Sequence, residues 1–277
     1  MMAPLIDHYA VFGNPIAHSK SPLLQAAFAE QTQQTIEYTA QCVDIGHFNT
    51  AADTFFSQGG KGLNVTVPFK LDAFNYASQL NHRAQRAGAV NTLSINSAGI
   101  IIGDNTDGIG MINDISRNLG WPLKNKRVLL LGAGGAVRGV LEPLIQAQVH
   151  SITIANRTLE KAVTLAADFS DTVEITPRTF SELSDQEFDV IINGTSASLS
   201  GDLPPLPSKI IRDDVCCYDM MYSKELTPFL NWCQQQGAKK VSDGLGMLVC
   251  QGAESFFIWR GIKPETKPVI DMLRKSL

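Results

Sequence analysis

The sequence predicts an α/β protein of two domains, in which strands and helices alternate along the chain. In the stretch 127–139, four apolar residues run into a glycine turn, and helix-forming residues follow as far as Gln148. This order is typical of a parallel strand that is buried on both faces and followed by its crossover helix. The length of 277 residues exceeds that of most single domains. We expect residues 1–106 plus 245–277 to form an open α/β domain, and residues 107–244 to form a second domain with a doubly wound sheet.

Composition and charge exclude several classes of function. With 44% hydrophobic and 18% charged residues, the chain has the composition of an ordinary globular protein. With a net charge of −4 and a pI near 5.7, the protein has no overall positive charge that would attract nucleic acid. A bound anion must therefore be met by local groups such as Arg138 and Arg157.

Cysteine usage and the N-terminus predict a cytoplasmic protein. The five cysteines are odd in number, contain no C-x-x-C pair and have no histidine at zinc spacing, so we expect reduced thiols and no metal site. Residues 1–8 lack the basic and apolar segments of a signal peptide. No apolar run approaches the roughly 18 residues of a membrane span, so no membrane partner is expected.

The first domain begins with a strand at 9–12 and a loop that carries Ser19 and Ser21. Ser21 suits the N-cap, and Pro22 the first position, of a helix that runs to about residue 33. Further elements are expected in this order: a strand at 36–43, a helix capped by Asp44, a strand at 63–67, a helix at 77–87, and strands at 89–95 and 100–102.

The strand at 63–67 leads directly to a candidate catalytic residue. The side chains of this strand alternate between apolar and polar. Pro68 has no backbone N–H to donate to a neighbouring strand, so the strand ends there. We therefore expect Phe69 and Lys70 at the carboxyl end of this strand. In an open α/β sheet, that edge is where ligands bind.

The chain is expected to cross between the domains twice. The first crossing follows the polar turn at 103–108, and the second lies at 243–246. Closing helices at 247–259 and 267–275 should return to the first domain. Between the crossings we expect further strands at 151–155, 172–175, 188–193, 215–218 and 240–242, and helices at 159–169 and 227–236.

The glycine turn after the strand at 128–131 predicts a pyrophosphate cradle. A phosphate reaches backbone N–H groups only where no Cβ intervenes, and the helix N-terminus behind the turn favours anions. The third glycine of a G-x-G-x-x-G motif is replaced by Val137, and similar turns occur in proteins that bind no nucleotide. The residues expected to form the cradle are Gly132, Ala133, Gly134, Gly135 and Ala136.

The end of the next strand indicates which nucleotide the cradle would hold. Asn156, Arg157 and Thr158 stand where an acid would accept the ribose hydroxyls of NAD. Arg157 and the Thr158 hydroxyl can instead donate to a 2′-phosphate, and Lys161 adds charge one helical turn on. This favours NADP. The alternative is a solvated helix start that Thr158 caps.

Six motifs, spread in order over almost the whole chain, together resemble shikimate dehydrogenases of the single-function bacterial type. The resemblance implies a Rossmann-like NADP-binding domain and the NADPH-dependent, reversible reduction of 3-dehydroshikimate to shikimate, in the pathway to chorismate and aromatic amino acids. The motifs are Tyr-Ala-Val-Phe-Gly-Asn-Pro-Ile-Ala-His-Ser-Lys-Ser-Pro from Tyr9, Asn-Val-Thr-Val-Pro-Phe-Lys from Asn64, Gly-Ala-Val-Asn-Thr from Gly88, Gly-Asp-Asn-Thr-Asp-Gly from Gly103, the Gly132 turn with Asn-Arg-Thr from Asn156, and Asp-Gly-Leu-Gly-Met-Leu from Asp243.

The resemblance implies that Lys70 and Asp107 flank the reacting oxygen. Reduction of a ketone needs a hydride and a proton for the developing alkoxide, which a positioned acid can supply or stabilise. Without the family, Lys70 would be an ordinary surface charge and Asp107 a helix N-cap. Whether Lys70 donates the proton or mainly stabilises charge stays open, because burial and a carboxylate neighbour shift a lysine pKa in opposite directions.

Other positions match the family's binding residues, although each also has an ordinary structural explanation. His82 departs from the acid that relatives often carry, which leaves a cofactor contact there open. The resemblance implies that Ser19, Ser21 and Tyr222 bind the substrate carboxylate, that Thr66, Asn91 and Gln251 bind the ring hydroxyls, and that Met220 and Gly244 lie near the nicotinamide.

Two other functions compete with this hypothesis. One is a quinate/shikimate dehydrogenase of relaxed specificity that uses NAD, against which Arg157 argues. The other is a nucleotide-sensing regulator on the same fold, which would need neither Lys70 nor Asp107. The oligomeric state is left between monomer and homodimer.

Overall fold

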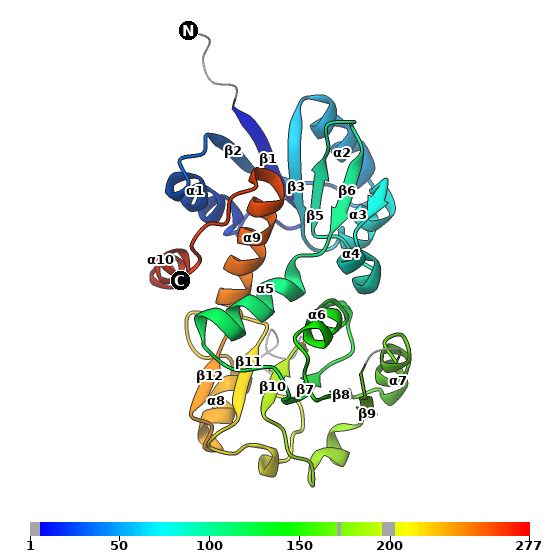
Figure 1. Ribbon diagram of the computed structural model, residues 1–277, viewed down its shortest axis with the longest axis vertical. Helices are drawn as coiled ribbons and strands as arrows, with labels where there is room; N and C mark the ends of the chain where they lie inside the picture. Colours follow the sequence, from blue (N-terminus) through cyan, green and yellow to red (C-terminus); the bar gives the residue numbers. More distant parts are fainter. Residues whose placement is uncertain (1–5, 171–172, 196–202) are drawn as a thin grey trace. The chain divides into compact units, whose positions relative to one another are not determined.

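The computed structural model describes residues 6–170, 173–195 and 203–277, and the chain divides into two compact units (Figure 1). One unit comprises the chain up to Gly110 together with Val249–Leu273. The other comprises Met111–Leu248 and Arg274–Leu277. Each unit has a sheet of six described strands flanked by helices, so the predicted two-domain α/β class is confirmed.

The first unit contains a mixed sheet with the strand order β2-β1-β3-β5-β6-β4. Strands β1, β2 and β3 are parallel, as two β-α-β units require, whereas β5 runs antiparallel to both β3 and β6. The strands are β1 Asp7–Gly13, β2 Ile36–Cys42, β3 Gly60–Val65, β4 Gln79–Leu80, β5 Thr92–Ile95 and β6 Ile101–Asp104. The helices are α1 Ser21–Gln31, α2 Phe48–Ser57, α3 Lys70–Tyr76, α4 His82–Ala87, α5 Asp107–Asn113, α9 Leu245–Arg260 and α10 Lys267–Lys275.

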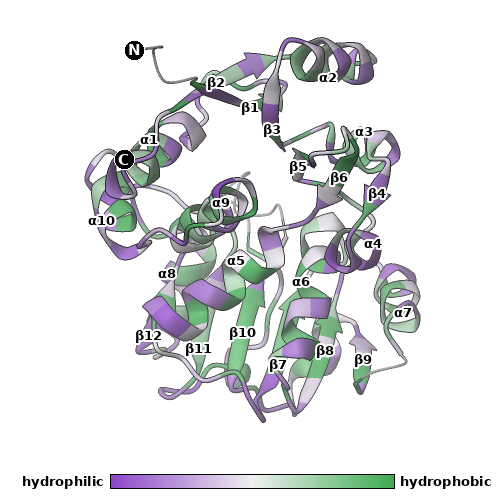
Figure 2. Cartoon of the chain, turned by 45° about the horizontal axis from the view of Figure 1, so that its top comes forward, coloured by the Kyte–Doolittle hydropathy of each residue, from purple (hydrophilic) through white to green (hydrophobic). Residues whose placement is uncertain are grey.

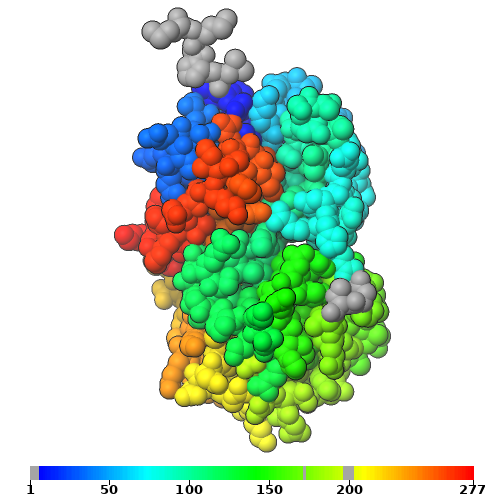
Figure 3. Space-filling view, in the orientation of Figure 1, coloured from blue at the N-terminus to red at the C-terminus, as the bar shows by residue number. Residues whose placement is uncertain are grey.

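Helix α9 returns to the first unit and packs against α1 and β5, as predicted. The Gln25 side chain on α1 donates to the carbonyl oxygen of Gly252 at 3.1 Å. The indole of Trp259 donates to the carbonyl oxygen of Leu93 at 3.0 Å and stacks on the ring of Tyr9. In the space-filling view, the orange surface of α9 lies beside the blue surface of α1 (Figure 3).

The second unit contains a parallel sheet with the strand order β12-β11-β10-β7-β8-β9. Its central strands are strongly hydrophobic, because helices cover both faces (Figure 2). The strand order reverses between β7 and β10, and ligands of doubly wound sheets bind at that point. The elements are β7 Arg127–Leu131, α6 Gly135–Gln146, β8 Ser151–Ala155, α7 Leu159–Ala167, β9 Ile175–Arg178, β10 Val190–Asn193, β11 Cys216–Asp219, α8 Pro228–Gln235 and β12 Lys240–Ser242.

The predicted single helix at 77–87 is wrong. Helix α3 begins at Lys70 and ends at Tyr76, β4 pairs with β6, and α4 starts only at His82. The Asn81 side chain caps α4 by accepting the Ala84 N–H at 3.1 Å. Lys70 therefore opens a helix of its own, shortly after the end of β3.

Two other expectations are also corrected. Asp44 does not cap α2, because His47 occupies the N-cap position and the Asp44 carbonyl accepts the His47 N–H. The strand expected at 172–175 runs instead over β9, from Ile175 to Arg178; Thr172 lies outside the described residues. Pro177 is tolerated in β9 because this strand forms the edge of its sheet.

Helix α5 continues into a π-helical turn, Asp114–Asn118. Asp114 is 2% exposed, and its carboxylate accepts hydrogen bonds from Tyr218 and Asn118, at 2.8 and 2.9 Å. Burial raises the pKa of Asp114 above that of an ordinary carboxyl. Among the described residues, the helices are all too short or too polar to cross a bilayer.

Candidate active site

Lys70 and Asp107 form an ion pair in the first unit. Each is the first residue of its helix: Lys70 follows the turn after β3, and Asp107 follows the turn after β6. Lys70 Nζ lies 2.5 Å from Asp107 Oδ2, with the side chains 32% and 21% exposed. The pair is thus shielded from bulk water on most sides but still open to a small molecule.

The carboxylate of Asp107 does not cap its own helix. The Asp107 N–H donates to Asn105 Oδ1 at 3.1 Å, so Asn105 satisfies this end of α5. The carboxylate of Asp107 is therefore free of a capping role. Its two oxygens accept from Lys70 and from Asn91 Nδ2, the latter at 2.7 Å.

Asn91 connects the ion pair to Gln251 on α9. Asn91 is 3% exposed, and its Nδ2 lies 3.4 Å from Gln251 Oε1 as well as within hydrogen-bonding distance of Asp107. The structure therefore brings together four of the residues predicted from the sequence: Lys70, Asp107, Asn91 and Gln251.

The loop that carries Ser19 and Ser21, called the serine loop below, has an internal hydrogen bond and a half-buried tyrosine, Tyr38, as its neighbour. Lys20, not Ser21, occupies the N-cap position of α1, so the predicted Ser21 cap is wrong. Ser21 is the first helical residue, and its N–H donates to Ser19 Oγ at 3.3 Å. Burial raises the pKa of Tyr38 well above the usual range of a phenol, and a hydrogen bond to Ser21 opposes that shift.

Thr66 lies against the start of the serine loop. Its N–H donates to the carbonyl oxygen of Phe12 at 2.9 Å. Its methyl group lies 2.5 Å from the place that a Cβ on Gly13 would take, so only glycine fits at position 13. Thr66 is half-buried where β3 has just ended.

The glycine turn lines a cavity of about 680 Å³ in the second unit. The predicted cradle residues Gly132 to Ala136 all line it, together with Asn156 and Arg157. Gly132 has φ +102°, and a Cβ there would lie 3.3 Å from the carbonyl oxygen of Gly194. The turn can therefore form only with glycine at 132.

The next two glycines leave room for a ligand. A Cβ on Gly134 or Gly135 would meet no atom within 4 Å, and both residues line the cavity. Their N–H groups lie at the N-terminus of α6, a helix of 12 residues whose dipole favours an anion. The turn thus fits a pyrophosphate.

Of the residues expected to bind the adenosine, Asn156 and Arg157 line this cavity, Lys161 lines a neighbouring one, and Thr158 is among the lining residues of neither. Asn156 is half-buried, and its Nδ2 donates to the carbonyl oxygen of Thr158 at 2.8 Å; Arg157 is exposed. Thr158 occupies the N-cap position of α7, but its side chain makes no capping hydrogen bond. The capping explanation of Thr158 is therefore not supported.

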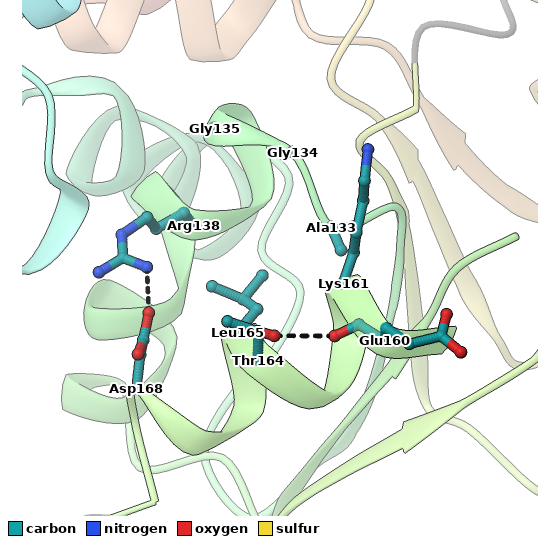
Figure 4. Close-up of a pocket in the computed structure, with 9 residues that line it drawn as sticks. All are labelled: Ala133, Gly134, Gly135, Arg138, Glu160, Lys161, Thr164, Leu165 and Asp168. Atoms are coloured by element: carbon teal, nitrogen blue, oxygen red, sulfur yellow. Dashed lines mark hydrogen bonds and ion pairs between the residues drawn. The ribbon is translucent and has the colours of Figure 1, made fainter. Parts of the chain in front are cut away.

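Lys161 lines the second hollow, of about 360 Å³, which shares Ala133, Gly134 and Gly135 with the first (Figure 4). Its ammonium end extends past the glycine turn, whereas the Glu160 carboxylate points the other way (Figure 4). Arg138 is paired with Asp168 and is partly neutralised. Arg157 thus lines one cavity and Lys161 the other.

Met220 lies beside the mouth of the glycine turn. Its sulfur is 3.2 Å from the place that a Cβ on Gly194 would take. A Cβ on Gly244 would lie 2.2 Å from the carbonyl oxygen of Met220, so the two backbones touch at Gly244. Tyr222 is half-buried, and burial together with the negative charge of Asp243 raises its pKa.

Several residues around these sites were not predicted. Thr195 follows β10 and lines the large cavity, and its hydroxyl donates to Asn193 Oδ1 at 2.7 Å. The position of Thr195 at the end of the strand beside β7 was the signal for it. Phe180 and residues 203–205 also line this cavity, with no motif to mark them. His82 is exposed at the first position of α4.

Three family models match successive parts of the chain. One, described as the shikimate dehydrogenase substrate binding domain, matches residues 11–93. A second, described as shikimate / quinate 5-dehydrogenase, matches residues 114–200. A third, described as the shikimate 5′-dehydrogenase C-terminal domain, matches residues 244–274.

Individual relatives match over nearly the whole length. A shikimate dehydrogenase (NADP(+)) from Cellvibrio japonicus is 57% identical over 273 residues, which are 99% of this chain and 99% of that protein. The structure of an Ael1 enzyme from Pseudomonas putida superposes with a TM-score of 0.92 at 46% identity, over 96% of this chain and 98% of that one. Shikimate 5-dehydrogenase from Thermus thermophilus, solved in complex with NADP(H) and shikimate, gives a TM-score of 0.86 at 31% identity, over 98% of this chain and 100% of that one.

Proposed function

Because the chain belongs to the shikimate dehydrogenase family, we propose that it catalyses the reversible, NADPH-dependent reduction of 3-dehydroshikimate to shikimate, a step toward chorismate and the aromatic amino acids. The observation that carries this proposal is the Lys70–Asp107 pair, at 2.5 Å, with Asn91 fixed on the second carboxylate oxygen. A reversible reduction at a ketone needs a positioned group that stabilises or protonates the developing alkoxide, which this pair can supply, whereas a protein that only binds a nucleotide needs none.

When bound, NADPH would supply the hydride. As negative charge develops on the substrate oxygen, the Lys70 ammonium stabilises it and can donate the proton, since the Asp107 carboxylate carries none. The Asp107 carboxylate holds the ammonium in place through their hydrogen bond, and Asn91 holds that carboxylate. In the direction of shikimate oxidation, the same pair accepts the hydroxyl proton.

We propose that the substrate is bound by residues 1–106 and 245–277 together with Asp107 and Tyr222. Protein hydroxyl groups can donate hydrogen bonds to the single carboxylate of the substrate, and side-chain amides can bind the hydroxyls of its ring. The contacts among Asn91, Gln251 and Asp107 support the ring site. The assigned residues are Ser19, Ser21 and Tyr222 for the carboxylate, and Thr66, Lys70, Asn91, Asp107 and Gln251 for the ring.

We propose that residues 107–244 bind NADP. The open space before Gly134 and Gly135 supports a pyrophosphate site there, and the position of Arg157 in the same cavity supports a 2′-phosphate site. The assigned residues are Gly132, Ala133, Gly134, Gly135, Ala136, Asn156, Arg157, Thr158 and Lys161 for the adenosine and phosphates, and Met220 and Gly244 for the nicotinamide.

A spectrophotometric assay tests the function directly. Purified protein with shikimate and NADP should produce the absorbance of reduced nicotinamide, with kcat/KM higher for NADP than for NAD and higher for shikimate than for quinate. A preference for NAD would contradict the cofactor assignment, and an absence of turnover with shikimate would contradict the proposed activity.

We further propose that the enzyme acts in the cytoplasm, as a monomer or homodimer. Light scattering can distinguish these two oligomeric states.

A further inference from the structure

Three buried hydroxyl groups form a cluster next to Asn91. Ser255 on α9 and Thr106 are each 0% exposed, and Thr92 on β5 is 1% exposed. Ser255 Oγ lies 2.8 Å from Thr92 Oγ1 and 3.3 Å from Thr106 Oγ1, and Asn64 Nδ2 donates to it at 3.0 Å. Ser255 thus joins two strands of the sheet and the turn after β6 to helix α9.

This cluster selects the orientation of the Asn91 amide. Asn91 Oδ1 accepts from the Thr106 N–H at 2.9 Å, from Thr92 Oγ1 at 2.9 Å and from Thr106 Oγ1 at 3.1 Å. The amide nitrogen is therefore left to face the Asp107 carboxylate. The opposite orientation would set an oxygen against that carboxylate and an amide nitrogen against the Thr106 N–H, which cannot turn to another acceptor as the two hydroxyls can; this is costly in a buried site.

Ser255 also lies against the backbone of Gln251, four residues earlier. The single hydroxyl proton of Ser255 has two acceptors within reach, Thr92 Oγ1 at 2.8 Å and the carbonyl oxygen of Gln251 at 3.1 Å. A Cβ on Gly110 would lie 2.6 Å from the Gln251 backbone nitrogen, so α5 and α9 are in close contact there. Helix α9 can neither slide along the sheet nor approach α5 more closely without breaking these contacts.

The network continues to the serine loop. Asn64 Oδ1 accepts from the Tyr38 hydroxyl at 2.7 Å, and Tyr38 in turn is hydrogen-bonded to Ser21. Asn64 is itself 6% exposed. The groups proposed for the carboxylate and for the ring of the substrate are therefore connected through one buried chain of hydrogen bonds, with Ser255 at its branch point.

We infer that Ser255 is a positioning residue for catalysis: through Thr92 and Thr106 it fixes the Asn91 amide that holds Asp107 against Lys70. Ser255 touches neither member of the pair and acts only through this network. The inference rests on the proposed function in that it takes the Lys70–Asp107 pair as the site of reduction. Small displacements of such groups reduce turnover strongly, because the reacting atoms must be aligned.

The test is a comparison of kinetic constants. Ser255→Ala should lower kcat for shikimate oxidation by about 10- to 100-fold, the cost of a displacement of about 1 Å at a reacting centre. KM for NADP should stay within roughly two-fold, because the cofactor residues are assigned to the other unit. A variant with wild-type kcat would overturn the inference.

A matched variant separates positioning from loss of packing. Phe256→Leu, at the next position of α9, loosens a buried ring pair with Phe28 and leaves the hydroxyl cluster intact. It should lower the melting temperature at least as much as Ser255→Ala but leave kcat nearly unchanged. An equal fall in kcat in both variants would show that Ser255 is merely structural, and would overturn the inference.

Thr92 provides an independent probe of the same network. Thr92→Val keeps the shape of the side chain but removes its hydroxyl, and should reproduce the fall in kcat. Thr92→Ser keeps the hydroxyl and should restore most of it. If serine and valine behave alike, the hydroxyl is not what positions Asn91, and the inference fails.

A crystal structure of Ser255→Ala distinguishes this inference from the proposed function. If the wild-type protein does not oxidise shikimate, the proposed function fails, but the structure still tests the positioning. The inference predicts that the Asn91 amide rotates, or that Asp107 moves away from Lys70 by about 0.5 Å or more. An unchanged arrangement of these side chains would overturn it.

Discussion

The Nζ atom of Lys70 lies 2.5 Å from Oδ2 of Asp107, although the two residues are 37 positions apart in the sequence. Each stands at the first position of a short helix, so the backbone sets the direction in which each side chain leaves. The pair requires both turns to be correctly formed, and its removal should affect chemistry more than binding.

We predict that Lys70→Ala lowers kcat by about 10²- to 10⁴-fold, the usual contribution of a positioned acid or base. KM for shikimate should change by only a few-fold, since the ammonium acts mainly in the transition state. Steady-state assays with shikimate and NADP measure both constants. Lys61→Ala, which removes an exposed lysine of β3, is the control and should behave as the wild type. Near-normal turnover of Lys70→Ala would end the catalytic assignment.

Arg157→Ala should reduce the preference for NADP over NAD. Loss of a charge-assisted hydrogen bond of about 1.5–3 kcal/mol corresponds to a fall of about 10- to 100-fold in kcat/KM for NADP, with NAD nearly unaffected. Arg212→Ala removes an arginine that pairs with Asp214 elsewhere in the same unit and should change neither value. Equal losses with both nucleotides would argue that Arg157 does not meet the 2′-phosphate.

Gly134→Val should block the cofactor site without harming the fold. Gly134 has φ −92° and ψ −177°, which valine adopts readily, and a Cβ there meets no protein atom within 4 Å. We expect an unchanged melting temperature and a KM for NADP raised about 10-fold or more, because the new side chain occupies the space before the N–H groups. Normal NADP affinity in a folded variant would place the pyrophosphate elsewhere.

Gly244→Ala should show the opposite behaviour and destabilise the second unit. Its Cβ would lie 2.2 Å from the Met220 carbonyl oxygen, a backbone atom that cannot rotate away. Overpacking of this kind costs about 1–3 kcal/mol. Urea unfolding measures the loss. A variant as stable as the wild type would show that the contact relaxes easily.

Arg83 should be among the most important residues for the stability of the first unit. It bonds both oxygens of Asp104, at 3.0 and 2.6 Å, and Glu254 at 2.9 Å, and all three side chains are at most 24% exposed. Arg83→Ala leaves two carboxylates without their cation and should cost about 3–5 kcal/mol. Arg83→Lys keeps the charge and should cost less. Equal losses in the free energy of unfolding for Arg83→Ala and Arg83→Lys would mean that the packing of Arg83, rather than its charge, is responsible for the stabilisation.

Asp114 should make stability depend on pH. Because burial raises its pKa in the folded protein, folding favours the protonated form. Its contribution is greatest below the unfolded carboxyl pKa of about 4 and is lost as the pH rises through the folded pKa. The free energy of unfolding of Asp114→Asn should therefore improve relative to the wild type as the pH rises above about 4. A constant difference across that range would contradict this assignment.

The sequence predicted elements well where a strong periodic pattern coincided with local signals. Strand β12 and helix α10 have the predicted bounds, and the glycine turn forms as expected. Around Lys70 the prediction failed because two short helices flank a two-residue strand, β4, which exists only through its pairing with β6. Such pairing joins residues that are distant in the sequence, so no periodic pattern of apolar residues marks the strand.

In the candidate site, too, residues marked by a sequence motif were predicted, and residues that act through non-local contacts were not. Lys70, Asp107 and Asn91 were found because they stand in motifs of the family. No role was predicted for Ser255, which lies outside the motifs, or for Thr92, which ends one of them, since the two lie 163 positions apart and each alone resembles an ordinary small polar residue. Their role depends on burial and on shared partners, and these exist only in the folded chain.

The stacking of Trp259 on Tyr9 provides an intrinsic optical probe of the first unit. Of the three tryptophans in the sequence, Trp259 belongs to this unit, whereas Trp121 and Trp232 belong to the other. Replacing Trp121 and Trp232 by phenylalanine would leave a protein whose tryptophan fluorescence reports on the first unit alone. The melting of that unit could then be followed by itself, without any attached label.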